Sequence, residues 1–69
     1  MDKFWITPQY GGKVFDVEIS GWVLSSRKQL MSALTKIQTD YDVTIISIHR
    51  FMSMWNIHYV VFTEKNKNG

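Results

Sequence analysis

The chain has 69 residues, a formal net charge of +2 and no cysteine. A chain of this length forms one domain with a small core, and the lack of cysteine excludes disulfide bridges, thiolate metal sites and cysteine nucleophiles. The small positive charge gives only weak attraction to nucleic acid or anionic lipid.

The first predicted element is a hairpin. Two glycines at 11–12 separate runs rich in aromatic and β-branched residues, which predicts strands at about 3–9 and 13–24 joined by a two-residue turn. The expected partners across this turn are Phe4 and Ile19, Trp5 and Glu18, Ile6 and Val17, and Thr7 and Asp16. This register sorts the apolar residues onto one face and most polar residues onto the other, so turn and alternation agree.

Two tryptophans interrupt the expected polar face of this hairpin. Trp5 lies on that face by its register, and Trp22 joins it unless Gly21 forms a bulge that reverses the alternation. The exposed side of the hairpin is therefore expected to carry large apolar groups.

A helix is predicted next, because Ser26–Gln29 has the spacing of a capping box. Its expected apolar stripe comprises Leu30, Ala33, Leu34, Ile37 and Tyr41. Its expected solvated positions are Lys28, Ser32, Thr35, Lys36 and Thr39. The sequence at 40–42 is expected to end the helix, whose stripe then covers one face of a sheet.

A second hairpin is predicted from strands at about 43–49 and 56–64, although its turn within 51–55 lacks glycine and asparagine. A turn at Ser53 and Met54 would pair Ile48 with Tyr59 and Ile46 with Val61. The opposite face of the sheet, which the helix does not cover, is called here the open face. It is expected to hold Ile45, Ser47, His49, His58, Val60 and Phe62. A one-residue slip would redistribute these residues, and that alternative stays open.

These elements predict an α+β domain over residues 1–64, with a ββαββ order, a mainly antiparallel four-stranded sheet and one helix packed on one face. Residues 65–69 are expected to form a polar, disordered tail. The strand order is left open, and so is parallel pairing of the two strands that flank the helix.

The apolar surplus predicts a partner-binding surface. Its candidate residues are Trp5, Trp22, Met52, Met54 and Trp55. Tryptophan and methionine are enriched at interface cores. Three interpretations stay open: a homodimer joined sheet to sheet, docking of a different protein, and a turn that packs on its own core.

Basic residues in the first turn of the helix oppose the helix dipole, which favours either a solvated end or an anion contact. The candidates for an anion or polar contact are Ser26, Arg27, Lys28 and Arg50. No glycine-rich phosphate loop accompanies them, so nucleotide binding is not expected.

No metal, cofactor or enzyme activity is expected. His49 and His58 would face each other across the second hairpin, but two ligands are too few for a zinc site. No nucleophile motif accompanies the serines, histidines and acids.

The predicted function is that of a small, non-enzymatic protein-binding module in the cytoplasm, with no membrane segment. Its small size, marginal core and apolar tip suit an accessory or inhibitory protein of the kind that phages and mobile elements encode to occlude a host protein. The alternative is binding of single-stranded nucleic acid by sheet aromatics together with Lys3, Lys13, Arg50, Lys65 and Lys67. Asp16 and Glu18, on the face that would meet the phosphates, argue against this alternative.

Overall fold

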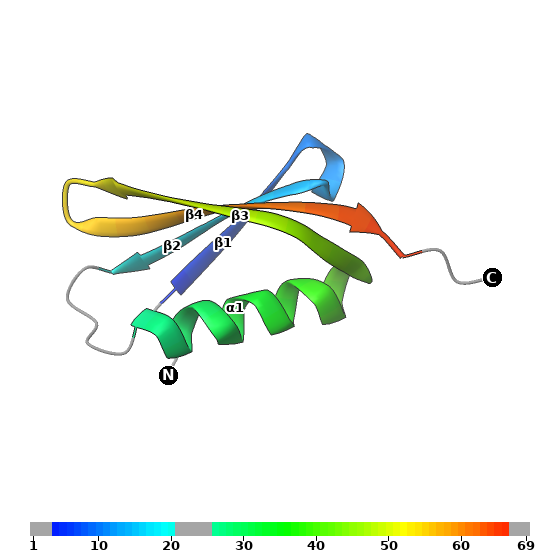
Figure 1. The fold of residues 1–69 in the computed structure, drawn as a ribbon, viewed down its shortest axis with the longest axis horizontal. Helices are drawn as coiled ribbons and strands as arrows, with labels where there is room; N and C mark the ends of the chain where they lie inside the picture. The colour runs from blue at the N-terminus through cyan, green and yellow to red at the C-terminus, as the bar shows by residue number, and fades with distance from the viewer. Residues whose placement is uncertain (1–3, 21–25, 67–69) are drawn as a thin grey trace.

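The computed structural model describes residues 4–20 and 26–66. Its elements in chain order are β1 (Phe4–Gln9), a short 3-10 turn (Tyr10–Gly12), β2 (Val14–Ser20), α1 (Ser26–Tyr41), β3 (Val43–Ser53) and β4 (Asn56–Lys65). The four strands form one sheet, and α1 lies across one of its faces (Figure 1). The predicted α+β, ββαββ architecture is confirmed.

The strand order is β1-β2-β4-β3, and every neighbouring pair is antiparallel. Strand β4 therefore lies between the two strands that flank the helix. The parallel pairing of β2 with β3 that the sequence left open does not form, because β4 occupies the position between them. This order makes β1 and β3 the two edges of the sheet.

The first hairpin has the predicted register, with Ile6 opposite Val17. Gly11 and Gly12 adopt φ angles of +65° and +86°, and the Lys13 N–H donates to the Tyr10 carbonyl at 3.3 Å. Glycine takes these angles without steric cost, which is why the turn forms here. Trp22 and Gly21 lie outside the described residues, so the predicted bulge stays a prediction.

The core lies between the sheet and α1. Its buried members are Phe15, Val17, Ile19, Ala33, Ile37, Val43 and Val61. The predicted apolar stripe of α1 faces this core, with Leu30 and Leu34 packed at its margin. Tyr41 closes one end by placing its ring edge-on to that of Phe15, with centroids 4.7 Å apart. All five positions predicted to be solvated are exposed.

Helix α1 ends where the sequence indicated. Asp42 follows it with a φ of +53°, the left-handed conformation that commonly terminates helices. The chain then turns directly into β3. At the other end Ser26 is the first described helical residue, and its predicted capping role stays a prediction.

The predicted register of the second hairpin is wrong by two residues. The turn is formed by Met54 and Trp55, so Ser53 faces Asn56 and Ile48 faces Val61. A shift of two keeps the alternation, so His49, His58, Val60 and Phe62 still lie on the open face. The two histidines are not opposed, because His49 faces Val60 and His58 faces Phe51.

A β-bulge in β3 corrects two further expectations. Ile45 faces Thr63 and Ser47 faces Phe62, which leaves Ile46 without a directly opposite residue. Ile45 consequently packs against the core instead of joining the open face. Ile46, expected to face the helix, is exposed. A bulge adds one residue to one strand and reverses the alternation at that point.

The prediction of a tail from residue 65 onward is wrong for residues 65 and 66. Lys65 is the last residue of β4 and pairs with Val43. The Asn66 side chain donates to the Asp42 carboxylate at 3.0 Å and accepts from the Thr44 hydroxyl. These contacts join residues 65 and 66 to the end of the sheet.

Candidate protein-binding site

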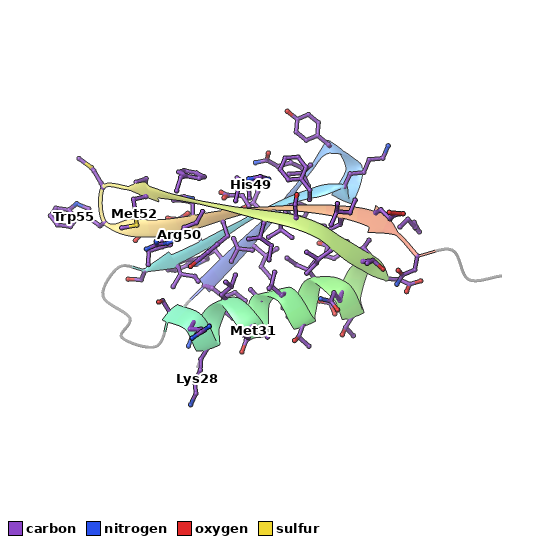
Figure 2. All side chains as sticks on the ribbon, viewed as in Figure 1. Lys28, Met31, His49, Arg50, Met52 and Trp55 are labelled. Atoms are coloured by element: carbon purple, nitrogen blue, oxygen red, sulfur yellow. The ribbon has the colours of Figure 1, made fainter. Side chains whose placement is uncertain are left out.

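The β3–β4 hairpin extends beyond the first turn of α1, so its tip is not covered by the helix (Figure 1). At the turn Met54 is 91% exposed and Trp55 is 68% exposed. Figure 2 shows the Trp55 side chain at the extreme end of the molecule. The alternative in which this turn packs on its own core is therefore wrong for these two side chains.

Two apolar side chains of β3 adjoin the turn from opposite faces. Phe51 lies on the open face, and Met52 lies on the helix side opposite Ile57. The Arg50 guanidinium donates to the Met52 sulfur at 3.7 Å, so its cation lies beside the exposed methionine (Figure 2). The four apolar residues at this end, Phe51, Met52, Met54 and Trp55, are called here the hairpin tip.

Trp5 is exposed on the open face but lies on the opposite edge of the sheet. The register aligns Trp5, Glu18, His58 and Phe51 in one row across the four strands. Three strand spacings of about 4.8 Å place Trp5 roughly 14 Å from Phe51. Of the five predicted partner-binding residues, the structure therefore brings Met52, Met54 and Trp55 together. Trp22 lies outside the described part of the chain.

Three polar side chains, Ser53, His58 and Asp16, contact one another in a row across the open face behind the tip. This row is called here the polar seam. The Ser53 hydroxyl lies 3.1 Å from His58 Nε2, and His58 Nδ1 lies 3.4 Å from the Asp16 carboxylate. The Phe51 ring stacks on the imidazole with centroids 4.8 Å apart. Only 13% of the His58 side chain is exposed, so these neighbours fix the ring.

Sequence reasoning missed this seam because it depends on β4 pairing with β2. Only that strand order places His58 next to Asp16, and only the observed register places it within reach of Ser53. The same pairing lets the Asn56 amide donate to the Glu18 carboxylate.

The contacts follow the order serine, histidine, aspartate that activates a serine nucleophile in hydrolases. Such an enzyme also needs a pocket beside the serine and donors aimed at the developing oxyanion. Three cavities are lined by described residues: one near Gly12 and Tyr41, one between Phe4 and α1, and one on the outer side of α1. None of these three includes a residue of the seam.

The charges of the open face are acidic. Its charged side chains among the described strand residues are Asp16, Glu18 and Glu64, with His49 and His58 as the titratable bases. Lys65 and Arg50 occupy helix-side positions of their strands, and Lys13 lies at the first turn. No lysine or arginine of the described strands therefore lies beside the open-face aromatics to contact phosphate.

The predicted anion-contact residues do not form one cluster. Ser26, Arg27 and Lys28 lie in the first turn of α1, and Lys28 points away from the sheet (Figure 2). Arg50 lies on β3, beside Met52. Arg27 and Lys28 are exposed, as expected for the solvated end of a helix.

The described residues contain no group of three metal-ligating side chains. His49 is placed against the edge of the Phe62 ring, with centroids 5.5 Å apart. Nor does α1, the helix described, have the length and apolar character required to cross a bilayer.

Comparison with known proteins finds no match to any family model, any curated protein or any solved structure.

Proposed function

We propose that this protein is a non-enzymatic protein-binding module that contacts its partner through the hairpin tip. The observation that carries the proposal is the exposure of Met54 and Trp55 at a turn that lacks the residues turns usually require. Glycine, asparagine or aspartate would suit the backbone better at a two-residue turn. Large apolar side chains that do not contribute to the core are explained by contact with another surface.

The composition of the tip suits such a contact. Unbranched methionine side chains adapt to an irregular partner surface, and tryptophan supplies a large rigid contact area. Arg50 lies beside Met52 and offers a cation at the margin of the apolar group. A partner with an apolar groove bordered by carboxylates would complement both features.

Nucleic-acid binding is the weaker alternative. Aromatic residues do lie on the open face, but the fixed charges between Trp5 and Phe51 are the carboxylates of Asp16 and Glu18. Phosphate contacts require lysine or arginine along the path of the backbone. A module that occludes a host protein, as accessory and inhibitory proteins do, fits the small size and the single apolar tip better.

The test is affinity capture from a lysate of the cells that produce the protein. Wild type is compared with Met54→Ala and Trp55→Ala at low and high salt. Matched controls are Met31→Ala on α1 and Tyr10→Ala at the opposite end, because these side chains are 59% and 78% exposed. We expect a specific protein that both tip variants lose and both controls retain, with little dependence on salt.

The proposal is contradicted if the tip variants, folded by circular dichroism, capture the same proteins as wild type. Release of the captured material by salt or nuclease would instead support nucleic acid as the ligand.

A further inference from the structure

The two edges of the sheet differ in how far they permit further strand pairing. The Thr63 N–H donates to the Lys13 carbonyl at 3.0 Å, which shows that odd-numbered residues of β4 bond toward β2. Backbone groups of an antiparallel ladder alternate in direction. In β3 the groups directed outward are therefore those of Ile48, Arg50 and Met52, and in β1 those of Phe4, Ile6 and Pro8.

The β1 edge is blocked against pairing. Its described part has 6 residues, and Pro8 occupies an outward position, where it has no N–H to donate. Proline and short length are the usual means by which proteins protect an edge strand.

The β3 edge lacks both proline and short length, although it carries one charged side chain, Arg50, and one bulge. It has 11 residues and contains no proline or lysine. Its outward positions alternate Ile48, Arg50 and Met52, and both apolar members are exposed, Ile48 by 38%. The bulge at Ile46 limits regular pairing to the half of β3 nearer the tip.

We propose that two copies of this chain form a dimer by antiparallel pairing of β3 with β3, with the two-fold axis at His49. This edge adjoins the hairpin tip and shares Met52 with it, but the pairing of Ile48 with Arg50 does not involve Met54 or Trp55, so the inference does not depend on the proposed function. Each open edge finds an identical partner, and the blocked β1 edges end the assembly at two copies.

Charge and the bulge exclude an axis at either residue next to His49 in the strand. An axis at Arg50 would oppose two arginines, which is destabilising. An axis at Ile48 would place Arg50 opposite the bulged Ile46, where the regular ladder ends. With an axis at His49, Ile48 of each copy lies opposite Arg50 of the other. In each of these two pairs, both residues donate one backbone hydrogen bond and accept one.

The experiment is sedimentation equilibrium of the full chain at about pH 8. It compares wild type with Ile48→Lys and Ile48→Glu. In the proposed dimer residue 48 of each copy faces Arg50 of the other, which gives two equivalent pairs. Lysine at position 48 would place two like charges in each pair, and glutamate would place two opposite charges there. We expect Ile48→Lys to raise the dimer dissociation constant at least about tenfold and Ile48→Glu to leave it within about threefold of wild type or to tighten it.

Circular dichroism confirms that both variants are folded, which the partial exposure of Ile48 permits. A monomeric wild type, or equal weakening by lysine and glutamate, overturns the proposal. Loss of the dimer in Trp55→Ala but not in Ile48→Lys also overturns it, because the tip would then be the self-association surface. An intact dimer in Trp55→Ala supports the edge as the interface, even if the tip captures no partner.

Discussion

Tyr10 has a left-handed backbone although it is not glycine. Its φ is +51°, and its side chain is largely exposed at the first turn. In this region the Cβ atom of an ordinary residue approaches the following carbonyl, at a cost of roughly 1–2 kcal/mol. The strain is local, because the neighbouring glycines already supply the rest of the turn.

Replacing Tyr10 by asparagine should therefore stabilise the protein. Asparagine tolerates the left-handed region, and the exposed ring contributes little burial, so we expect a gain of about 0.5–1 kcal/mol. Urea unfolding followed by circular dichroism measures the change. Gln9→Asn is the matched control, since Gln9 has an extended backbone with φ −136° and should gain nothing. Equal effects at both positions would contradict the assignment of strain to Tyr10.

Ser53 tests the interpretation of the polar seam. Its hydroxyl contacts His58, yet none of the cavities described above adjoins it. We expect no covalent labelling of wild type by a fluorophosphonate probe, as judged by intact-protein mass spectrometry. Stoichiometric labelling that disappears in both Ser53→Ala and His58→Gln would identify an activated serine and an enzyme.

At the scale of the elements, the bulge in β3 explains how this strand pairs with β4 in two registers, one before Ile46 and one after it. Ile45 and Ile48 both face the helix side, although they are three positions apart, with two residues between them. Regular alternation would put one of them on the open face. Ile46 absorbs the difference and is the one residue of β3 whose removal restores regular pairing.

Deletion of Ile46 should therefore be tolerated. Ile45 and Ser47 would become neighbours on a regular strand, still opposite Thr63 and Phe62. Deletion of His49 is the matched control, because it shifts the strand by one residue and moves one half to the wrong face. We expect a cooperative thermal transition for the first deletion and loss of folding for the second. The opposite result would show that the bulge is required.

The two hairpins also show what sequence reasoning can predict. In the first, the glycine turn and the alternation of Phe15, Val17 and Ile19 specify the same register, which is the one observed. In the second, the turn at Met54 and Trp55 carries no turn residues, and the bulge is invisible to periodicity. The register was therefore wrong by two residues, while the face of most residues was right.

The candidate site likewise has one part that the sequence could predict and one part that it could not. Met52, Met54 and Trp55 could be named from composition, because their surplus apolar area is a property of the sequence. The seam of Asp16, Ser53 and His58 could not, because it requires the order β2-β4-β3. Strand order depends on how the helix crosses the sheet, and local propensities do not determine it.

At the scale of the whole molecule, the features at the two ends differ. At the end near Tyr41, the Tyr41 ring packs on Phe15, Asn66 contacts Asp42 and Thr44, and one cavity lies beside Gly12. The other end presents the hairpin tip beyond the first turn of the helix (Figure 1). The exposed apolar tip at one extremity suits the proposed end-on contact with a partner.

The most direct test of this account is site-specific photocrosslinking. A photoreactive amino acid replaces Met54 in one variant and Met31 in another, and each is irradiated in a lysate of the producing cells. We predict one discrete crosslinked protein from position 54 and none from position 31. Crosslinking from position 31 alone, or the same diffuse pattern from both positions, would contradict the assignment of binding to the hairpin tip.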